Sequence, residues 1–136
     1  MTAPEAIHAN ARLVIDQLGP LSELGERFGY NRESVEWVEG FIERQRVRPD
    51  VRAADKARMV QVLGSFLGEC IVHTYGGEWR ERDGSWGVFF DPSNAAFPFS
   101  KVGKQFDNGA ESGDSILSFF DAVGIVILKR PGQPPV

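Results

Sequence analysis

The chain has 136 residues, of which 42% are hydrophobic and 25% are charged, and its formal net charge is −4. This length and composition are typical of one globular domain whose hydrophobic core is large enough without disulfide bonds or a structural metal ion. The acidic balance gives no support to a general role on nucleic acid or on a membrane surface, because both are negatively charged.

The single cysteine excludes an intrachain disulfide and fits a reducing compartment. The first residues lack the basic segment and apolar run of a secretory signal. No apolar run approaches the roughly 20 residues of a membrane span. We therefore expect a cytoplasmic protein that does not associate with membranes.

A first helix is predicted over residues 3–18. Thr2 can cap it, and Glu5 lies at the capping-box position. The Gly19-Pro20 pair ends the helix. Apolar spacing predicts an inner stripe of Leu13, Val14, Gln17 and Leu18.

Two more helices are predicted before the centre of the chain. A brief one covers residues 21–28, and a longer one covers residues 32–47 with Asn31 as its cap. Pro49 breaks the longer helix, because the residue before a proline avoids the helical region. Its expected inner face is Val35, Val38, Phe41, Ile42 and Gln45.

A long central helix is predicted to begin near Val51, with Asp50 as a cap, and to end at the Gly76-Gly77 pair. Over residues 59–91, the buried part of this helix leads directly into a hairpin. Gly64 and Gly68 lie one turn apart, and each costs about 1 kcal/mol relative to alanine, so we expect another backbone to approach there. The apolar stripe is Val60, Leu63, Phe66, Leu67, Cys70 and Ile71.

Asp83-Gly84 is typical of a type I′ hairpin turn. Pairing outward from that turn sets Arg82 opposite Ser85 and Trp79 opposite Val88. Alternation then places Trp79, Trp86, Val88 and Phe90 on the inner face of the hairpin. Phe89 is an apolar residue on the polar face. It either covers a sheet edge, pairs with a later segment or marks a surface contact.

The C-terminal part predicts a short strand and two helices. The strand covers residues 95–99 and lies at an edge, because Pro98 lacks an N–H. A helix over residues 100–107 follows, and Asp114 or Ser112 caps the last helix. Residues 124–128 fit either a helix or a strand, and the tail at 129–136 is expected to be disordered.

These elements predict an α+β fold, with N-terminal helices packed on a small antiparallel sheet of two or three strands. One or two C-terminal helices close the fold. We expect one domain over residues 1–128.

The strings LGSFLGE, GGEW, PFSKVGKQFDNG and SILSFFDAV resemble those of small uncharacterised bacterial domains. In these domains a helical part precedes a short sheet and a closing helix. The similarity covers about residues 63–123 and consists of glycines, aromatics and a Pro-Phe pair. It implies the same fold, and it implies no activity, because none is established for that group.

Glu69 and His73 are the main candidates for chemistry, because residues four apart on a helix are neighbours. They could form an acid–base or metal pair, with Asp83 and Asp91 completing a pocket between the helix and the hairpin. Neither a metal motif nor a Cys/His cluster is present, and a surface ion pair explains the spacing more simply. Cys70 lies in the apolar stripe, which favours core packing over nucleophilic chemistry.

The segment at residues 44–58 holds six basic and two acidic side chains. Arginines at a helix C-terminus complement the dipole, but they could also dock an acidic partner. Trp37, Tyr30 and Tyr75 have no clear inward position and could join an interface. The residues predicted to bind a partner are Arg44, Arg46, Arg48, Arg52, Arg80, Arg82 and Phe89.

The sequence therefore favours a non-enzymatic protein-binding module, of an adaptor or immunity type, with an unknown and acidic protein partner. The alternative is an enzyme or small-ligand binder that uses the pocket of Glu69, His73, Asp83 and Asp91. Neither hypothesis calls for a cofactor, a bound metal or nucleic acid. A homo-oligomer is compatible with both.

Overall fold

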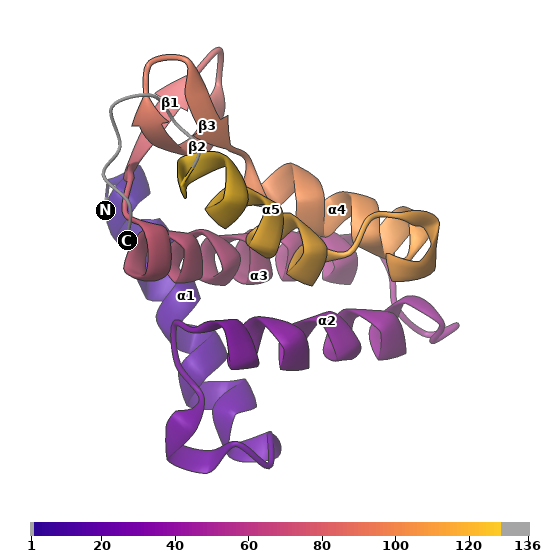
Figure 1. Ribbon diagram of the computed structural model, residues 1–136. Helices are drawn as coiled ribbons and strands as arrows, with labels where there is room; N and C mark the ends of the chain where they lie inside the picture. The colour runs from indigo at the N-terminus through magenta and orange to yellow at the C-terminus, as the bar shows by residue number, and fades with distance from the viewer. Residues whose placement is uncertain (1, 129–136) are drawn as a thin grey trace.

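The computed structural model describes residues 2–128. Five helices and a three-stranded antiparallel sheet form an α+β arrangement, which confirms the predicted fold class (Figure 1). Three 3-10 turns lie between the longer elements, at Gly19–Leu21, Gly25–Arg27 and Ala110–Ser112. The longer elements are α1 (Ala3–Leu18), α2 (Arg32–Arg46), α3 (Ala53–Tyr75), β1 (Glu78–Arg82), β2 (Ser85–Asp91), β3 (Asn94–Ala96), α4 (Pro98–Asn108) and α5 (Ile116–Leu128).

Helix α3 lies at the centre of the molecule. Figure 1 shows α1 crossing it and the sheet near its C-terminal end, and α4 and α5 pack against both α3 and α2. Every residue from Leu63 to Ile71 is buried, on all faces of the helix. The core therefore surrounds the middle of α3. Five of the six residues of the predicted stripe are buried and Val60 is half-buried, but the burial extends to the other faces of the helix as well.

Helices α1 and α2 begin at the predicted caps. The Thr2 hydroxyl accepts from the N–H of Glu5 at 3.3 Å, and the Asn31 side chain accepts from the N–H of Ser34 at 2.9 Å. The predicted inner stripe of α1 is displaced, because α1 packs on α3 through Ile7, Ala11 and Val14. Of the four residues expected to be inside, only Val14 is buried, and Gln17 is exposed.

Two other predictions for the N-terminal half are wrong. Residues 21–28 form separate turns rather than a helix, because Pro20, Gly25 and Gly29 interrupt any run long enough for repeated i to i−4 bonds. Asp50 does not cap α3. The cap is Arg52, whose N–H donates to the Asp55 carboxylate at 3.1 Å.

The two glycines of α3 make room for aromatic rings. A Cβ at Gly64 would lie 3.0 Å from the Cα of Phe99 and would overlap its ring. A Cβ at Gly68 would overlap the indole of Trp79. The predicted close approach is therefore present, and at Gly68 it is made by a side chain rather than by another backbone.

The hairpin has the predicted register, with Arg82 opposite Ser85 and Trp79 opposite Val88. Both turn residues have positive φ, 52° at Asp83 and 81° at Gly84, as a type I′ turn requires. The strand order is β1-β2-β3. Phe89 pairs with Ala95 of β3, which is one of the three roles expected for it.

The C-terminal boundaries differ from those predicted. Strand β3 is shorter than expected, because Pro98 starts α4, where a missing N–H costs nothing. Neither Asp114 nor Ser112 caps α5. The Ser115 hydroxyl accepts from the N–H of Ser118 at 3.0 Å instead. Residues 124–128 continue α5, and the predicted disordered tail lies outside the described residues.

Gly68→Ala and Gly103→Ala make a matched pair. We expect Gly68→Ala to destabilise the protein by about 1–3 kcal/mol, because the new methyl group would displace Trp79 from the core. Gly103 lies in α4 with no heavy atom within 4 Å of an added Cβ. Gly103→Ala should therefore stabilise by up to about 1 kcal/mol through helix propensity. Urea unfolding of both variants measures the difference, and equal effects would contradict the packing described for α3.

Candidate functional site

The four predicted pocket residues do not come together. Glu69 is buried in the core, whereas His73 is exposed, with its ring centroid 4.7 Å from that of Tyr30. Asp83 lies at the hairpin tip, and Asp91 lies at the other end of β2, where its carboxylate accepts from the N–H of Asn94. Within residues 2–128, no group of three or more His, Cys, Asp or Glu side chains could hold a metal ion.

Glu69 joins three elements by hydrogen bonds. Its Oε1 accepts from Nδ1 of His8 on α1 at 2.6 Å, and its Oε2 accepts from Nε1 of Trp79 on β1 at 3.0 Å. Glu69 is only 4% exposed, so both bonds offset the cost of removing a carboxylate from water. The prediction of a surface ion pair between Glu69 and His73 is wrong, because Glu69 points between α1 and the hairpin.

His8 was missed in the sequence analysis. The signal that could have found it is Glu69, a charged residue inside an otherwise apolar run. A charged side chain buried there needs a hydrogen-bonding partner from elsewhere in the chain. The carboxylate orients the imidazole through Nδ1, and the His8 side chain is 56% exposed. Such an arrangement can move a proton at Nε2. His8 does not line the cleft described next.

A cleft of about 710 Å³ lies beside these residues, between α1, α3, the hairpin tip and the start of α4. Ser65, one turn before Glu69, lies on its wall. Its lining mixes apolar groups with hydrogen-bonding ones. The apolar side includes Ile7, Trp86, Phe97 and Phe99, and the polar side includes Asn10, Gln61, Ser65, Arg82, Asp83 and Ser100.

Arg82 is held at the cleft by two aromatic rings. Its guanidinium carbon lies 5.1 Å from the ring centroid of Phe89 and 5.4 Å from that of Phe97. Both distances are typical of cation–π contacts. Phe89 is 8% exposed beneath this guanidinium. It is therefore not an exposed aromatic, because strand β3 and Phe97 cover the face on which it lies.

The predicted basic residues have internal contacts. Arg44 lies over the ring of Trp37 at 5.5 Å, and Arg46 donates to the carbonyl of Phe106 at 3.3 Å at the C-terminal end of α4. Arg48, Arg52 and Arg80 pair with neighbouring carboxylates. These pairs are Arg48–Asp50 at 2.8 Å, Arg52–Asp55 at 3.1 Å and Arg80–Glu78 at 2.8 Å.

The arginines also lower the pKa of two carboxyl groups. Hydrogen bonds from Arg48 and Arg52 are the first cause of the lowered pKa of Asp50 and Asp55, respectively. Each predicted arginine thus has a contact within the chain. Partner binding by this segment stays a prediction.

The remaining unplaced aromatics pack against the core rather than forming a surface cluster. The ring centroid of Trp37 lies 5.7 Å from that of Phe28, and the Tyr30 centroid lies 5.7 Å from that of Phe66. Tyr75 lies 5.0 Å from Phe120. Their half-buried positions come from packing across helices, which periodicity along one helix does not reveal.

Cys70 is fully buried, as the apolar stripe predicted. Burial raises the pKa of its thiol well above the usual value. A buried thiol kept in its neutral form does not act as a nucleophile.

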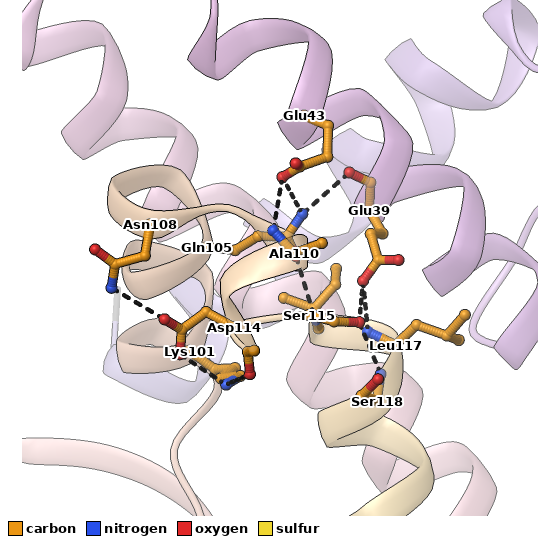
Figure 2. A network of polar contacts seen from close by, with 12 residues as sticks. Glu39, Glu43, Lys101, Gln105, Asn108, Ala110, Asp114, Ser115, Leu117 and Ser118 are labelled. Atoms are coloured by element: carbon orange, nitrogen blue, oxygen red, sulfur yellow. Dashed lines mark hydrogen bonds and ion pairs between the residues drawn. The ribbon is translucent and has the colours of Figure 1, made fainter.

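A second polar network joins α2, α4 and the start of α5 (Figure 2). Gln105 is fully buried at its centre. Its Nε2 donates to the Glu43 carboxylate at 2.9 Å and to the Glu39 carbonyl at 3.2 Å, and its Oε1 accepts from the N–H of Ile116 at 3.0 Å. The amide, carried by α4, therefore satisfies groups of both α2 and α5.

The carboxylates of α2 complete this network (Figure 2). Glu39 accepts from the Ser115 hydroxyl and from the N–H of Leu117, and so stabilises the N-terminus of α5. Glu43 also accepts from the N–H of Ala110 at 3.3 Å. The donors and acceptors in this network satisfy one another. This favours a structural role, in which the network holds the three helices together, over a role in binding a ligand.

Asp114, predicted as a cap, pairs instead with Lys101 at 3.1 Å and accepts from Asn108 at 3.0 Å. These contacts, with the Asn108 bond first, lower the pKa of the Asp114 carboxyl group. The side chain therefore fixes the loop between α4 and α5.

No protein-family model matches this chain, and the searches of curated proteins and of solved structures find no match either. The resemblance to small bacterial domains thus stays an expectation from the sequence. The helices within residues 2–128 include none with the combined length and hydrophobicity of a membrane span.

Glu69→Gln and His73→Ala test whether the Glu69 carboxylate has a structural role. Glu69→Gln leaves one acceptor oxygen for two donors, His8 and Trp79, and we expect a loss of about 1–3 kcal/mol in unfolding free energy. His73 is exposed, so His73→Ala should cost less than about 1 kcal/mol. Chemical denaturation measures both. A neutral Glu69→Gln would contradict a structural role for this carboxylate.

Proposed function

We propose that this protein is a non-enzymatic binding module, and that its partner is a protein segment held in the cleft between α1, α3, the hairpin tip and the start of α4. The observation that carries the proposal is the cleft itself, with its volume of about 710 Å³. A volume in this range is typical of specific binding sites.

The lining supports a protein segment as the occupant. Trp86, Phe97 and Phe99 offer apolar surface for a side chain to insert, and aromatic groups of this kind often anchor protein contacts. Asn10 and Ser100 can form hydrogen bonds with a backbone. The hairpin tip at residues 82–86 is mostly exposed and forms one wall of the cleft.

The positions of the titratable groups favour binding over catalysis. Glu69 uses both oxygens to hold α1 and the hairpin, and His73 and Asp91 lie away from the cleft. A general acid or base must lie within hydrogen-bonding reach of the proton that it transfers. In the cleft, Asp83 is the one carboxylate that could serve, and it lies in a turn.

The alternative is a small-molecule ligand in the same cleft. The observation that favours it is the cleft volume, which suits a metabolite as well as a peptide. The guanidinium of Arg82, held over two rings, could then contact an anionic group of the ligand.

Ala6→Arg and Ala9→Arg separate a cleft-binding partner from other contacts. Both residues lie on α1, but Ala6 lines the cleft, whereas Ala9 is exposed and does not. In quantitative pull-downs from the source cells, we expect a partner retained by the wild type and by Ala9→Arg to be lost from Ala6→Arg. Circular dichroism confirms that each variant is folded.

Loss of the partner from both variants, or from neither, would contradict binding in the cleft. Native mass spectrometry of the same three samples tests the alternative. A small molecule that is retained by the wild type and Ala9→Arg, and is absent from Ala6→Arg, would favour the small-ligand function instead.

A further inference from the structure

The cleft proposed above as the binding site is lined by two charged side chains, Arg82 and Asp83, at the hairpin tip. Arg82 is exposed, and its guanidinium contacts the rings of Phe89 and Phe97. Within residues 2–128 this guanidinium forms no ion pair and no hydrogen bond, and even the adjacent Asp83 does not pair with it. Its N–H donors are therefore available to a ligand in the cleft.

The two rings hold Arg82 in place. Phe89 and Phe97 meet edge to face, with their centroids 6.0 Å apart and an interplanar angle of 83°. Phe97 lies close against β2 because Gly87 has no side chain, and a Cβ added there would lie 2.8 Å from the Phe97 ring. A side chain that is already positioned loses less entropy when it binds a ligand.

Arg80 shows the contrast on the same strand. It lies two residues before Arg82 in β1, and its guanidinium pairs with the Glu78 carboxylate at 2.8 Å. Arg80 also does not line the cleft. At Arg82 the two rings supply the contact that a carboxylate supplies at Arg80, and the ring contacts leave the positive charge without a counter-charge.

The charges of the cleft favour a single carboxylate as the group that Arg82 binds. Arg82 is the one cation in the lining, and Asp83 follows it directly. A phosphate group carries nearly two negative charges, and the second would lie near Asp83 without a cation to offset it. The net charge of −4 disfavours a strongly acidic partner segment in the same way.

We propose that Arg82 selects a partner segment that carries one Asp or Glu side chain next to a bulky apolar residue. This inference rests on the proposed function, in which a protein segment occupies the cleft. The guanidinium donates to both oxygens of the carboxylate, a geometry that its planar fork matches. The apolar residue of the segment contacts Trp86 and Phe99, which line the cleft beside Arg82.

Selection from a displayed library of random peptides tests this inference on the full-length chain. The peptides are fused through their C-termini, so that an acidic preference belongs to side chains. We expect those retained by the wild type and by the matched control Arg80→Gln to carry an Asp or Glu next to a bulky apolar residue. In calorimetric titrations, Arg82→Gln should bind such a peptide about 10-fold or more weakly, because hydrogen bonds to a charged group are lost.

Ala6→Arg, which obstructs the cleft, separates two kinds of failure. Some peptides excluded by Ala6→Arg could lack the acidic preference, or bind Arg82→Gln as tightly as the wild type. Either result would overturn the inference and leave the proposed function intact. A selection without any peptide that Ala6→Arg excludes would contradict the binding of a protein segment in the cleft, and the inference with it.

Should Arg82→Gln fail to fold, the substitution is made in the selected peptide instead. Replacing its Asp or Glu by the matching amide leaves the protein unchanged. We then expect the amide peptide to bind the wild type about 10-fold or more weakly than the acidic peptide does. Equal affinities of the two peptides would overturn the inference.

Discussion

The rest of the structure depends on the close approach of two aromatic rings to α3. Phe99 occupies the space beside Gly64, and Trp79 occupies the space beside Gly68. These contacts bring the hairpin and the start of α4 against the same helix, although they come from different parts of the chain. The cleft lies between these elements and α1, so its walls exist because α3 has no side chains at two positions one turn apart.

Glu69 adds a polar constraint to this apolar contact. A buried carboxylate must keep its hydrogen-bonding partners, and its two partners here are His8 on α1 and Trp79 on β1. Trp79 therefore both fills the space at Gly68 and satisfies Glu69. Packing and hydrogen bonding fix the same indole, which holds α1 and the hairpin at the two sides of the cleft. A rigid cleft loses less entropy when it binds a partner.

Local patterns predicted much of this fold. The caps at Thr2 and Asn31, the stripe of α3 and the register of the hairpin depend on residues close together in the sequence. Contacts between distant segments were not predicted. The pairing of His8 with Glu69 and the bonds of Gln105 to α2 and α5 depend on how whole helices pack. Periodicity identifies the inner face of a helix, but it does not identify which side chain lies opposite.

The cleft was predicted only in its general location, between the central helix and the hairpin, and of its predicted residues only Asp83 lines it. Amide hydrogen exchange of the chain, with and without the captured partner, tests its role most directly. The account predicts slower exchange at the hairpin tip, residues 82–86, and in the first turns of α1. Slower exchange confined to residues 44–58, with an unchanged hairpin tip, would show that the partner binds the basic segment and would contradict the account.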